Sequence, residues 1–114
     1  MFQIKWAEEA DQQYKKLREN AEASLRSRQK KGKKKTSRAE GLFKQIHKIK
    51  LLTQNPRHPG LQTREYQSLE HPFNLEEKVF EAYAQHKTPG AYRIFWCYGP
   101  EKGQLTIIAI TPHP

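Results

Sequence analysis

The chain has 114 residues, of which 35% are hydrophobic and 29% charged. We expect residues 1–114 to form a single domain, because this length and apolar fraction suit one modest core. With 21 Lys and Arg against 12 Asp and Glu, the formal charge is +9, which predicts attraction to nucleic acid, anionic lipid or acidic proteins. The first residues, MFQIKWAEEADQQ, contain no long apolar stretch. We therefore expect no signal peptide and no membrane partner, and by default a cytoplasmic protein.

Signatures of metal, nucleotide and nucleophile chemistry are missing from the sequence. The five histidines show no HxxxH spacing, and the single cysteine, Cys97, cannot complete a Cys/His zinc site or an internal disulfide. No glycine-rich phosphate loop and no serine-nucleophile motif occurs. We therefore expect no cofactor and no metal, and a buried thiol at Cys97. The cations and acid–base groups in the second half of the chain suit phosphate chemistry without a metal.

The first half of the chain predicts a strand followed by two helices. Apolar and polar residues alternate over 2–6, as they do in a half-buried strand. Apolar residues then recur at spacings of three and four over about 8–30, the stripe of an amphipathic helix. A Thr-Ser pair at 36–37 offers a cap for a second helix with an apolar face at 42–52, which Asn55 ends.

A basic run links the two predicted helices. Residues 26–38 carry eight basic side chains and no acid. Like charges repel, so we expect the link at about 28–37 to be flexible and solvated. The functional alternative is sequence-blind binding to a phosphate backbone. On that alternative we assign RNA binding to Lys30, Lys31, Lys33, Lys34, Lys35 and Arg38.

The second half of the chain predicts an antiparallel run of strands. Candidates lie at 61–66 and 79–85, and the turn signal KTPG at 87–90 joins the second of these to 91–98 as a hairpin. The nearly all-apolar segment 105–111 predicts a central strand that is covered on both faces or packed under the helices. This order favours an α+β fold, in which an N-terminal strand is followed by a two-helix hairpin packed on one face of a small, mainly antiparallel sheet.

Arg93 is the first candidate for phosphate chemistry. Side chains alternate along the predicted strand 91–98, so Tyr92, Ile94, Trp96 and Tyr98 share one face. If that face packs under the helices, Arg93 lies on the other. An arginine on a rigid strand is a good phosphate clamp, because its planar guanidinium offers paired donors and keeps its charge. The alternative is a cross-strand ion pair, for instance with Glu81.

Three more residues are candidates for acid–base chemistry or phosphate contact. His113 follows the last predicted strand, and an imidazole exchanges protons near neutral pH, but a frayed terminus is the blander interpretation. Arg64 and Glu65 lie in or beside the strand 61–66. They offer a second phosphate contact and a base, or are solvated surface side chains.

The chain resembles the RelE/ParE superfamily of bacterial toxins from type II toxin–antitoxin pairs. The resemblance lies in FQIKWAEEA, in LLTQNPRHPG, and above all in PGAYRIFWCYGP followed by LTIIAITPHP. It covers nearly the whole chain in order. It implies a small antiparallel sheet with a helical hairpin. It also implies the activity of many members, which are endoribonucleases that cut messenger RNA on the ribosome.

The resemblance implies roles for the candidate residues. Arg93 matches the strand arginine that contacts the scissile phosphate. His113 falls where several members place a catalytic side chain, and Arg64 and Glu65 fall where members carry a basic residue or a general base. The implied reaction is a metal-free transesterification. A base activates the ribose 2′-hydroxyl, the arginines stabilise the growing charge, and His113 protonates the departing 5′ oxygen, leaving a 2′,3′-cyclic phosphate.

Two features depart from the family pattern. Glu81 and Tyr83 stand where some ribonuclease members have lysines, so either another base serves or the activity is altered. The lysine-rich link is longer than a tight helical hairpin needs, and one interpretation is an extra contact with ribosomal RNA.

The resemblance also implies partners and leaves two other functions open. The partners are a cognate antitoxin, the ribosome with its messenger RNA, and operator DNA bound through the antitoxin complex. The alternative functions are a ParE-type inhibitor of DNA gyrase, and an inactive basic module that binds antitoxin and operator DNA. Arg93 together with His113 favours the endoribonuclease, because a pure binder has no need of a proton donor beyond the last strand.

Overall fold

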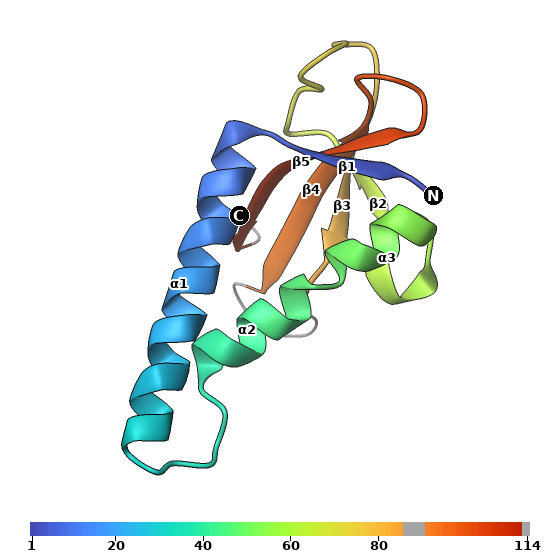
Figure 1. Cartoon of the computed structure of the whole chain (residues 1–114). Coiled ribbons are helices and arrows are strands. Elements are labelled where there is room, and N and C mark those ends of the chain that lie inside the picture. Colours follow the sequence, from blue (N-terminus) through green and yellow to red (C-terminus); the bar gives the residue numbers. More distant parts are fainter. Residues whose placement is uncertain (86–90, 113–114) are drawn as a thin grey trace.

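The computed structural model describes residues 1–85 and 91–112. Its elements are β1 (Gln3–Trp6), α1 (Glu8–Lys30), α2 (Arg38–Ile46), α3 (Ile49–Gln54), a 3₁₀ turn (Pro59–Leu61), β2 (Arg64–Tyr66), β3 (Val79–Tyr83), β4 (Tyr92–Tyr98) and β5 (Gln104–Pro112). The predicted α+β fold is confirmed (Figure 1). The turn predicted at 87–90 lies outside the described residues. Of the helices in the described part, none is long and apolar enough to cross a membrane.

The five strands form one mixed sheet. Their order is β1-β5-β4-β3-β2, with β1 parallel to β5 and the other neighbours antiparallel. The helices cover one face of this sheet, as predicted, and Figure 1 shows α1 and α2 as an antiparallel pair in front of it. The core between the layers joins Ala10 of α1 and Ile46 of α2 to Ile94 and Trp96 of β4.

Helix α1 also protects an edge of the sheet. Strand β1 stops at Trp6, opposite Ile107, so it leaves the rest of β5 without a strand on that side. Beyond this point the backbone N–H of Ile110 donates to Oε1 of Gln13 on α1, at 2.7 Å. A side-chain carbonyl thus replaces a strand partner at an edge that would otherwise expose an unpaired donor.

The second predicted helix is divided into α2 and α3. Ile46, Ile49 and Leu52 are all buried at spacings of three. In a straight α-helix, residues spaced by three shift steadily around the helix axis. A 3₁₀-helix has three residues per turn, so the same spacing keeps the side chains on one side of the axis. Backbone hydrogen bonds of the 3₁₀ type occur here. The N–H groups of residues 47, 48, 50 and 51 each donate to the carbonyl three residues earlier.

Arg28 fastens the far end of the helical hairpin. Its Nε and Nη2 donate to the carboxylate of Glu40 on α2 at 2.9–3.2 Å, and its Nη1 donates to the carbonyls of Lys33 and Lys34. Glu40 also completes a capping box with Ser37, the predicted cap of α2. The link predicted at 28–37 is therefore shorter, at 31–37, and its backbone is bonded to α1. Its flexibility stays a prediction.

The pH dependence of stability tests this ion pair. The hydrogen bond from Arg28, followed by those from Ser37, lowers the pKa of Glu40 from 4.5 to about 2. A carboxylate with a lowered pKa in the folded chain stabilises it above about pH 4.5, and this contribution is lost as the pH falls toward 2. We expect Glu40→Gln to lower the free energy of urea unfolding at pH 7, and the difference from wild type to shrink at pH 3.

The matched control is Glu22→Gln, because the ion pair of Glu22 with Arg18 is exposed and loose, at 3.9 Å. We expect this control to change stability little at either pH. A Glu40→Gln difference that stays the same from pH 7 to pH 3 would contradict the ion pair.

Candidate functional site

The face of the sheet turned away from the helices carries the clustered polar side chains, and we call it the open face. Alternation along β4 sends Ile94 and Trp96 into the helix-side core and Arg93 to the open face, as predicted. The register places Arg93 opposite Tyr83 on β3 and opposite Thr111 on β5. Arg93 therefore lies in the middle of the sheet, between two strands that hold its backbone.

The guanidinium group of Arg93 stacks on Tyr83 where β3 ends and β4 begins. Its guanidinium carbon lies 3.7 Å from the ring centroid of Tyr83. Its Nη1 donates to the carbonyls of Gln85, Ala91 and Tyr92 at 3.2–3.4 Å. Its Nε is buried and has no hydrogen-bond partner within the described residues. The side chain is thus preorganised by the ring and the carbonyls that hold it.

Glu81 lies on the open face, although the sequence does not single it out as a site residue. The register places it opposite Arg64 on β2, and Nε of Arg64 donates to Oε1 of Glu81 at 2.5 Å. The cross-strand ion pair predicted for Arg93 is thus formed by Arg64 instead. The Glu81 side chain is 2% exposed and that of Arg64 59% exposed, so the arginine lies over the carboxylate. This hydrogen bond raises the pKa of Arg64 above its usual value.

Tyr83 connects the two arginines. Its ring centroid lies 5.4 Å from the guanidinium carbon of Arg64, in addition to its closer stack on Arg93. The contacts therefore run in sequence from Glu81 through Arg64 and Tyr83 to Arg93. We call these four residues the open-face cluster. Cations against an aromatic ring gain electrostatic stabilisation, which here holds one guanidinium group from each neighbouring strand against the ring of Tyr83.

Glu65 is not brought to this cluster. It lies opposite the core residue Phe80, whereas its neighbour Arg64 lies opposite Glu81. Adjacent residues of a strand point to opposite faces, so only one of the two can share a face with Arg93. The Glu65 carboxylate instead pairs with Lys78 at 2.8 Å, and both side chains are exposed.

His113 lies outside the described residues, so its role stays a prediction. Strand β5 is described to Pro112, which lies opposite Tyr92, next to the Arg93–Thr111 pair. The described part of β5 therefore ends beside Arg93.

The loop of residues 67–78 is bonded to the far end of β4, at Tyr98. Nδ1 of His71 accepts from the backbone N–H groups of Phe73 and Asn74, so its Nε2 carries the proton and donates to the carbonyl of Tyr98 at 2.8 Å. Cys97 is fully buried, as predicted. Burial raises the pKa of its thiol to about 11, so it is not a nucleophile.

The arrangement offers positive charge, a carboxylate and aromatic faces. In the part of the chain that the structure describes, no three His, Cys, Asp or Glu side chains gather as metal ligands. A surface with two guanidinium groups is suited to a phosphodiester, since guanidinium forms charge-assisted bonds to phosphate oxygens. The partly exposed rings beside them are suited to unpaired bases.

Comparisons with known proteins show which fold the chain has. No protein-family model matches the sequence, and no curated protein matches it. Solved structures do match. The YoeB/ParE toxin from Agrobacterium tumefaciens has a TM-score of 0.62 at 8% identity, over 98% of this chain and 99% of that one. This chain has the fold of the YoeB and ParE toxins.

Two further structures of this fold come from Staphylococcus aureus. The YoeB dimer gives a TM-score of 0.56 at 15% identity, over 99% of this chain and 98% of that one. The heterotetrameric YoeB–YefM toxin–antitoxin complex gives 0.55 at 13% identity, over 100% and 99%. The fold that the RelE/ParE resemblance implies is thereby confirmed, and the open-face cluster lies on the sheet of a YoeB/ParE-type fold.

Substitution of Tyr83 tests the cluster. Tyr83→Phe keeps a ring against both guanidinium groups, and Tyr83→Leu removes it. A cation–π contact is worth about 0.5–2 kcal/mol, so we expect the Leu variant to unfold with a free energy about 1–3 kcal/mol below that of the Phe variant. Urea unfolding at pH 7 measures the difference, and equal stability of the two variants would show that Tyr83 does not hold the arginines.

Proposed function

We propose that this chain is the toxin of a toxin–antitoxin pair and that it cleaves messenger RNA on the ribosome. The observation that carries the proposal is the open-face cluster on a YoeB/ParE-type fold: two guanidinium groups and a buried carboxylate around one tyrosine ring. This combination suits the cleavage of a phosphodiester by the neighbouring ribose hydroxyl. Ribosomes as the site of action imply a cytoplasmic protein.

Arg93 is the residue that we assign to the scissile phosphate. It is held in place by the ring of Tyr83 and by the backbone carbonyls that accept from Nη1. A guanidinium group that is fixed in advance costs little reorganisation when negative charge develops on the non-bridging oxygens, and for this reason it stabilises a pentacoordinate phosphorane. The three backbone carbonyls on Nη1 keep the guanidinium plane in place during the reaction.

Glu81 is our assignment for the general base, in place of Glu65. It shares a face with Arg93, whereas Glu65 lies on the opposite face. In the free protein Arg64 lies over Glu81, but the arginine side chain is mostly exposed and reaches the surface. A bound phosphate attracts Arg64 outward, and the carboxylate then accepts a proton from the substrate.

The proposed reaction is balanced within the substrate and these side chains. Glu81 takes the proton of the 2′-hydroxyl, the 2′ oxygen forms a bond to phosphorus, and the bond from phosphorus to the 5′ oxygen breaks. His113, which follows the strand end beside Arg93, is the candidate donor of a proton to the leaving 5′ oxygen. The products are a 2′,3′-cyclic phosphate and a free 5′-hydroxyl.

An antitoxin is the proposed protein partner. The Staphylococcus aureus YoeB of the same fold forms a complex with YefM. The formal charge of +9 on this chain suits an acidic partner segment, whose binding over Arg64 and Arg93 would block the cluster. Operator DNA is then bound through the complex of the two proteins.

A cell-free translation reaction tests the function. We expect wild-type protein to create new 5′ ends in messenger RNA only when ribosomes are translating. Loss of one fixed donor to a developing oxyanion costs about 10²–10³ in rate, so we expect Arg93→Ala to reduce the cuts by that factor. The matched control is Arg18→Ala on the exposed side of α1, which should cut like wild type.

Intact messages with wild-type protein would overturn the endoribonuclease. A DNA gyrase supercoiling assay with the same protein then distinguishes the ParE-type inhibitor from a module that only binds antitoxin and DNA.

A further inference from the structure

The end of the helical hairpin is a concentrated positive surface that the open-face cluster does not use. We call residues 26–38 the hairpin tip. It holds eight basic side chains and no acid, and the four lysines of the loop, Lys31, Lys33, Lys34 and Lys35, are all exposed. Figure 1 shows this end of α1 and the loop projecting past the sheet, in a molecule with extents of 52 × 25 × 24 Å.

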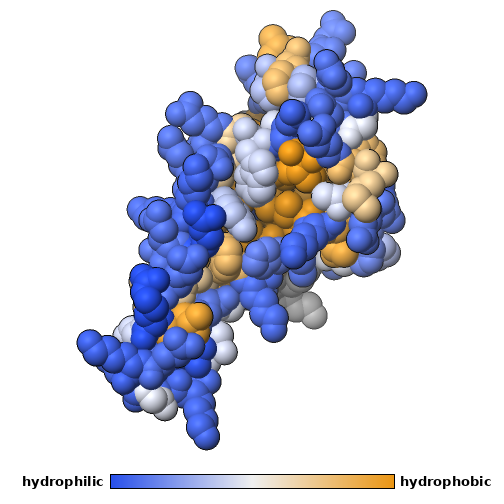
Figure 2. All heavy atoms as spheres, in the orientation of Figure 1, coloured by the Kyte–Doolittle hydropathy of each residue, from blue (hydrophilic) through white to orange (hydrophobic). Residues whose placement is uncertain are grey.

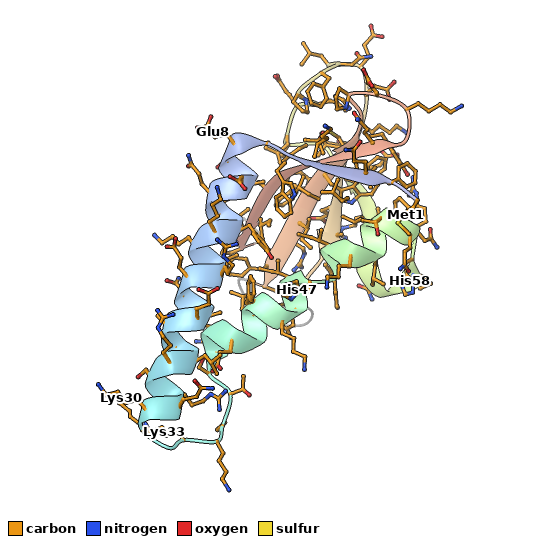
Figure 3. The ribbon with its side chains drawn as sticks, viewed as in Figure 1. Met1, Glu8, Lys30, Lys33, His47 and His58 are labelled. Carbon is orange, nitrogen blue, oxygen red and sulfur yellow. The ribbon has the colours of Figure 1, made fainter. Side chains whose placement is uncertain are left out.

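Within the described residues, most of the positive charge of the tip is not neutralised by an acid. The neighbouring acid, Glu40, forms its ion pair with Arg28. None of the four loop lysines forms an ion pair with a described residue. Figure 3 shows Lys30 and Lys33 at this end, with their side chains turned away from the sheet, and Figure 2 shows mostly hydrophilic side chains over it.

The loop backbone of the tip is bonded to α1. Arg28 donates to the carbonyls of Lys33 and Lys34, while the lysine side chains of the loop are exposed. A groove beside it is lined by Ser24, Ser27 and Ser37 together with Arg28 and lysines of the loop. Hydroxyl groups and ammonium groups around one groove are the donors that contact phosphate oxygens in nucleic-acid complexes.

The composition of the tip selects among phosphate ligands. No Phe, Tyr or Trp occurs anywhere in residues 24–40. Proteins hold single strands largely by stacking bases on aromatic rings, so the tip lacks what a single strand requires. A duplex presents one charge per about 1.7 Å and needs no base contact, so it matches a dense, purely cationic surface. The rings Tyr66 and Tyr83 lie instead on the opposite side of the sheet.

We propose that the hairpin tip is a docking site for the phosphate backbone of a nucleic-acid duplex, separate from the open-face cluster. Duplex RNA and duplex DNA share this chemistry. The site reads no sequence, and it holds the duplex on the helix side while the opposite face of the sheet stays free. The proposal does not depend on cleavage, because a chain without any ribonuclease activity would still bind in this way.

Two variants with equal charge change test the site. The tip variant replaces Lys31, Lys33, Lys34 and Lys35 by Gln. The control variant replaces four exposed lysines elsewhere, Lys5, Lys16, Lys50 and Lys102, by Gln. All eight side chains are on the surface, and circular dichroism checks that both variants fold. Fluorescence anisotropy with 20-base-pair RNA and DNA duplexes, over a series of salt concentrations, gives the affinity and its salt slope.

We expect the tip variant to bind the duplexes at least about tenfold more weakly at low salt and to lower the slope of log K against log salt by up to about 3.6, since each phosphate contact accounts for about 0.9. The control variant should change both by much less. Equal losses in the two variants would mean that net charge alone attracts the duplex, and an unchanged tip variant would place binding elsewhere; either result overturns the proposal.

Two further measurements distinguish the hairpin tip from the open-face cluster and from a membrane-binding surface. Arg93→Ala should bind the duplexes like wild type even if it has lost cleavage, so failure of the site and failure of the proposed function give different results. Vesicles of phosphatidylserine and phosphatidylcholine test an anionic membrane. Tip-dependent binding to these vesicles, without tip-dependent binding to either duplex, would overturn the assignment to nucleic acid.

Discussion

Strand β4 lies between β3 and β5, its residues 94–97 are buried on both faces, and the rest of the molecule depends on this position. Its even-numbered residues Ile94 and Trp96 complete the core under the helices. Because side chains alternate along a strand, Arg93 lies on the opposite face. There it contacts the ring of Tyr83 and donates to the carbonyl of Gln85. A charged side chain is thus fixed by the same pairing that forms the core, with no loop needed to position it.

The two ends of the molecule use arginine in the same manner for different purposes. At the hairpin tip, two nitrogens of Arg28 donate to the carboxylate of Glu40, and the third donates to two carbonyls of the loop. The charge of Arg28 is thus paired, and its hydrogen bonds join α1, the loop and α2. On the open face, Arg64 covers Glu81 but remains largely exposed. The first arrangement leaves the neighbouring loop lysines without an ion pair to any described residue. The second leaves an arginine that a phosphate is able to attract away.

Periodicity in the sequence predicts the regular elements well. The bounds of α1, the cap at Ser37 and the faces of β4 all follow from spacing, because each depends on residues close in the chain. The division of α2 from α3 was not predicted, although the spacing of three from Ile46 to Leu52 carries the signal. The strand predicted at 61–66 is shortened to Arg64–Tyr66, because Gln62 adopts a left-handed conformation after the 3₁₀ turn.

The site is less accessible to sequence reasoning, because it depends on register between strands far apart in the chain. Arg93 was found from alternation alone. The sequence offers Glu65 as a candidate base from its place in or beside the strand 61–66, whereas the pairing of β2 with β3 brings Glu81 to Arg64 and turns Glu65 away. The available signal was a single acid in the otherwise apolar and aromatic strand VFEAY.

The assignment of the open face as the reaction surface is tested most directly by comparing Glu81→Gln with Glu65→Gln in ribosome-dependent cleavage of messenger RNA. Both changes remove one negative charge from neighbouring strands, and they differ in the face on which the carboxylate lies. Removal of a general base typically costs about 10²–10⁴ in rate, so we expect Glu81→Gln to lose that factor while Glu65→Gln cuts like wild type. Retained cleavage by folded Glu81→Gln, or its loss in Glu65→Gln, would contradict the account.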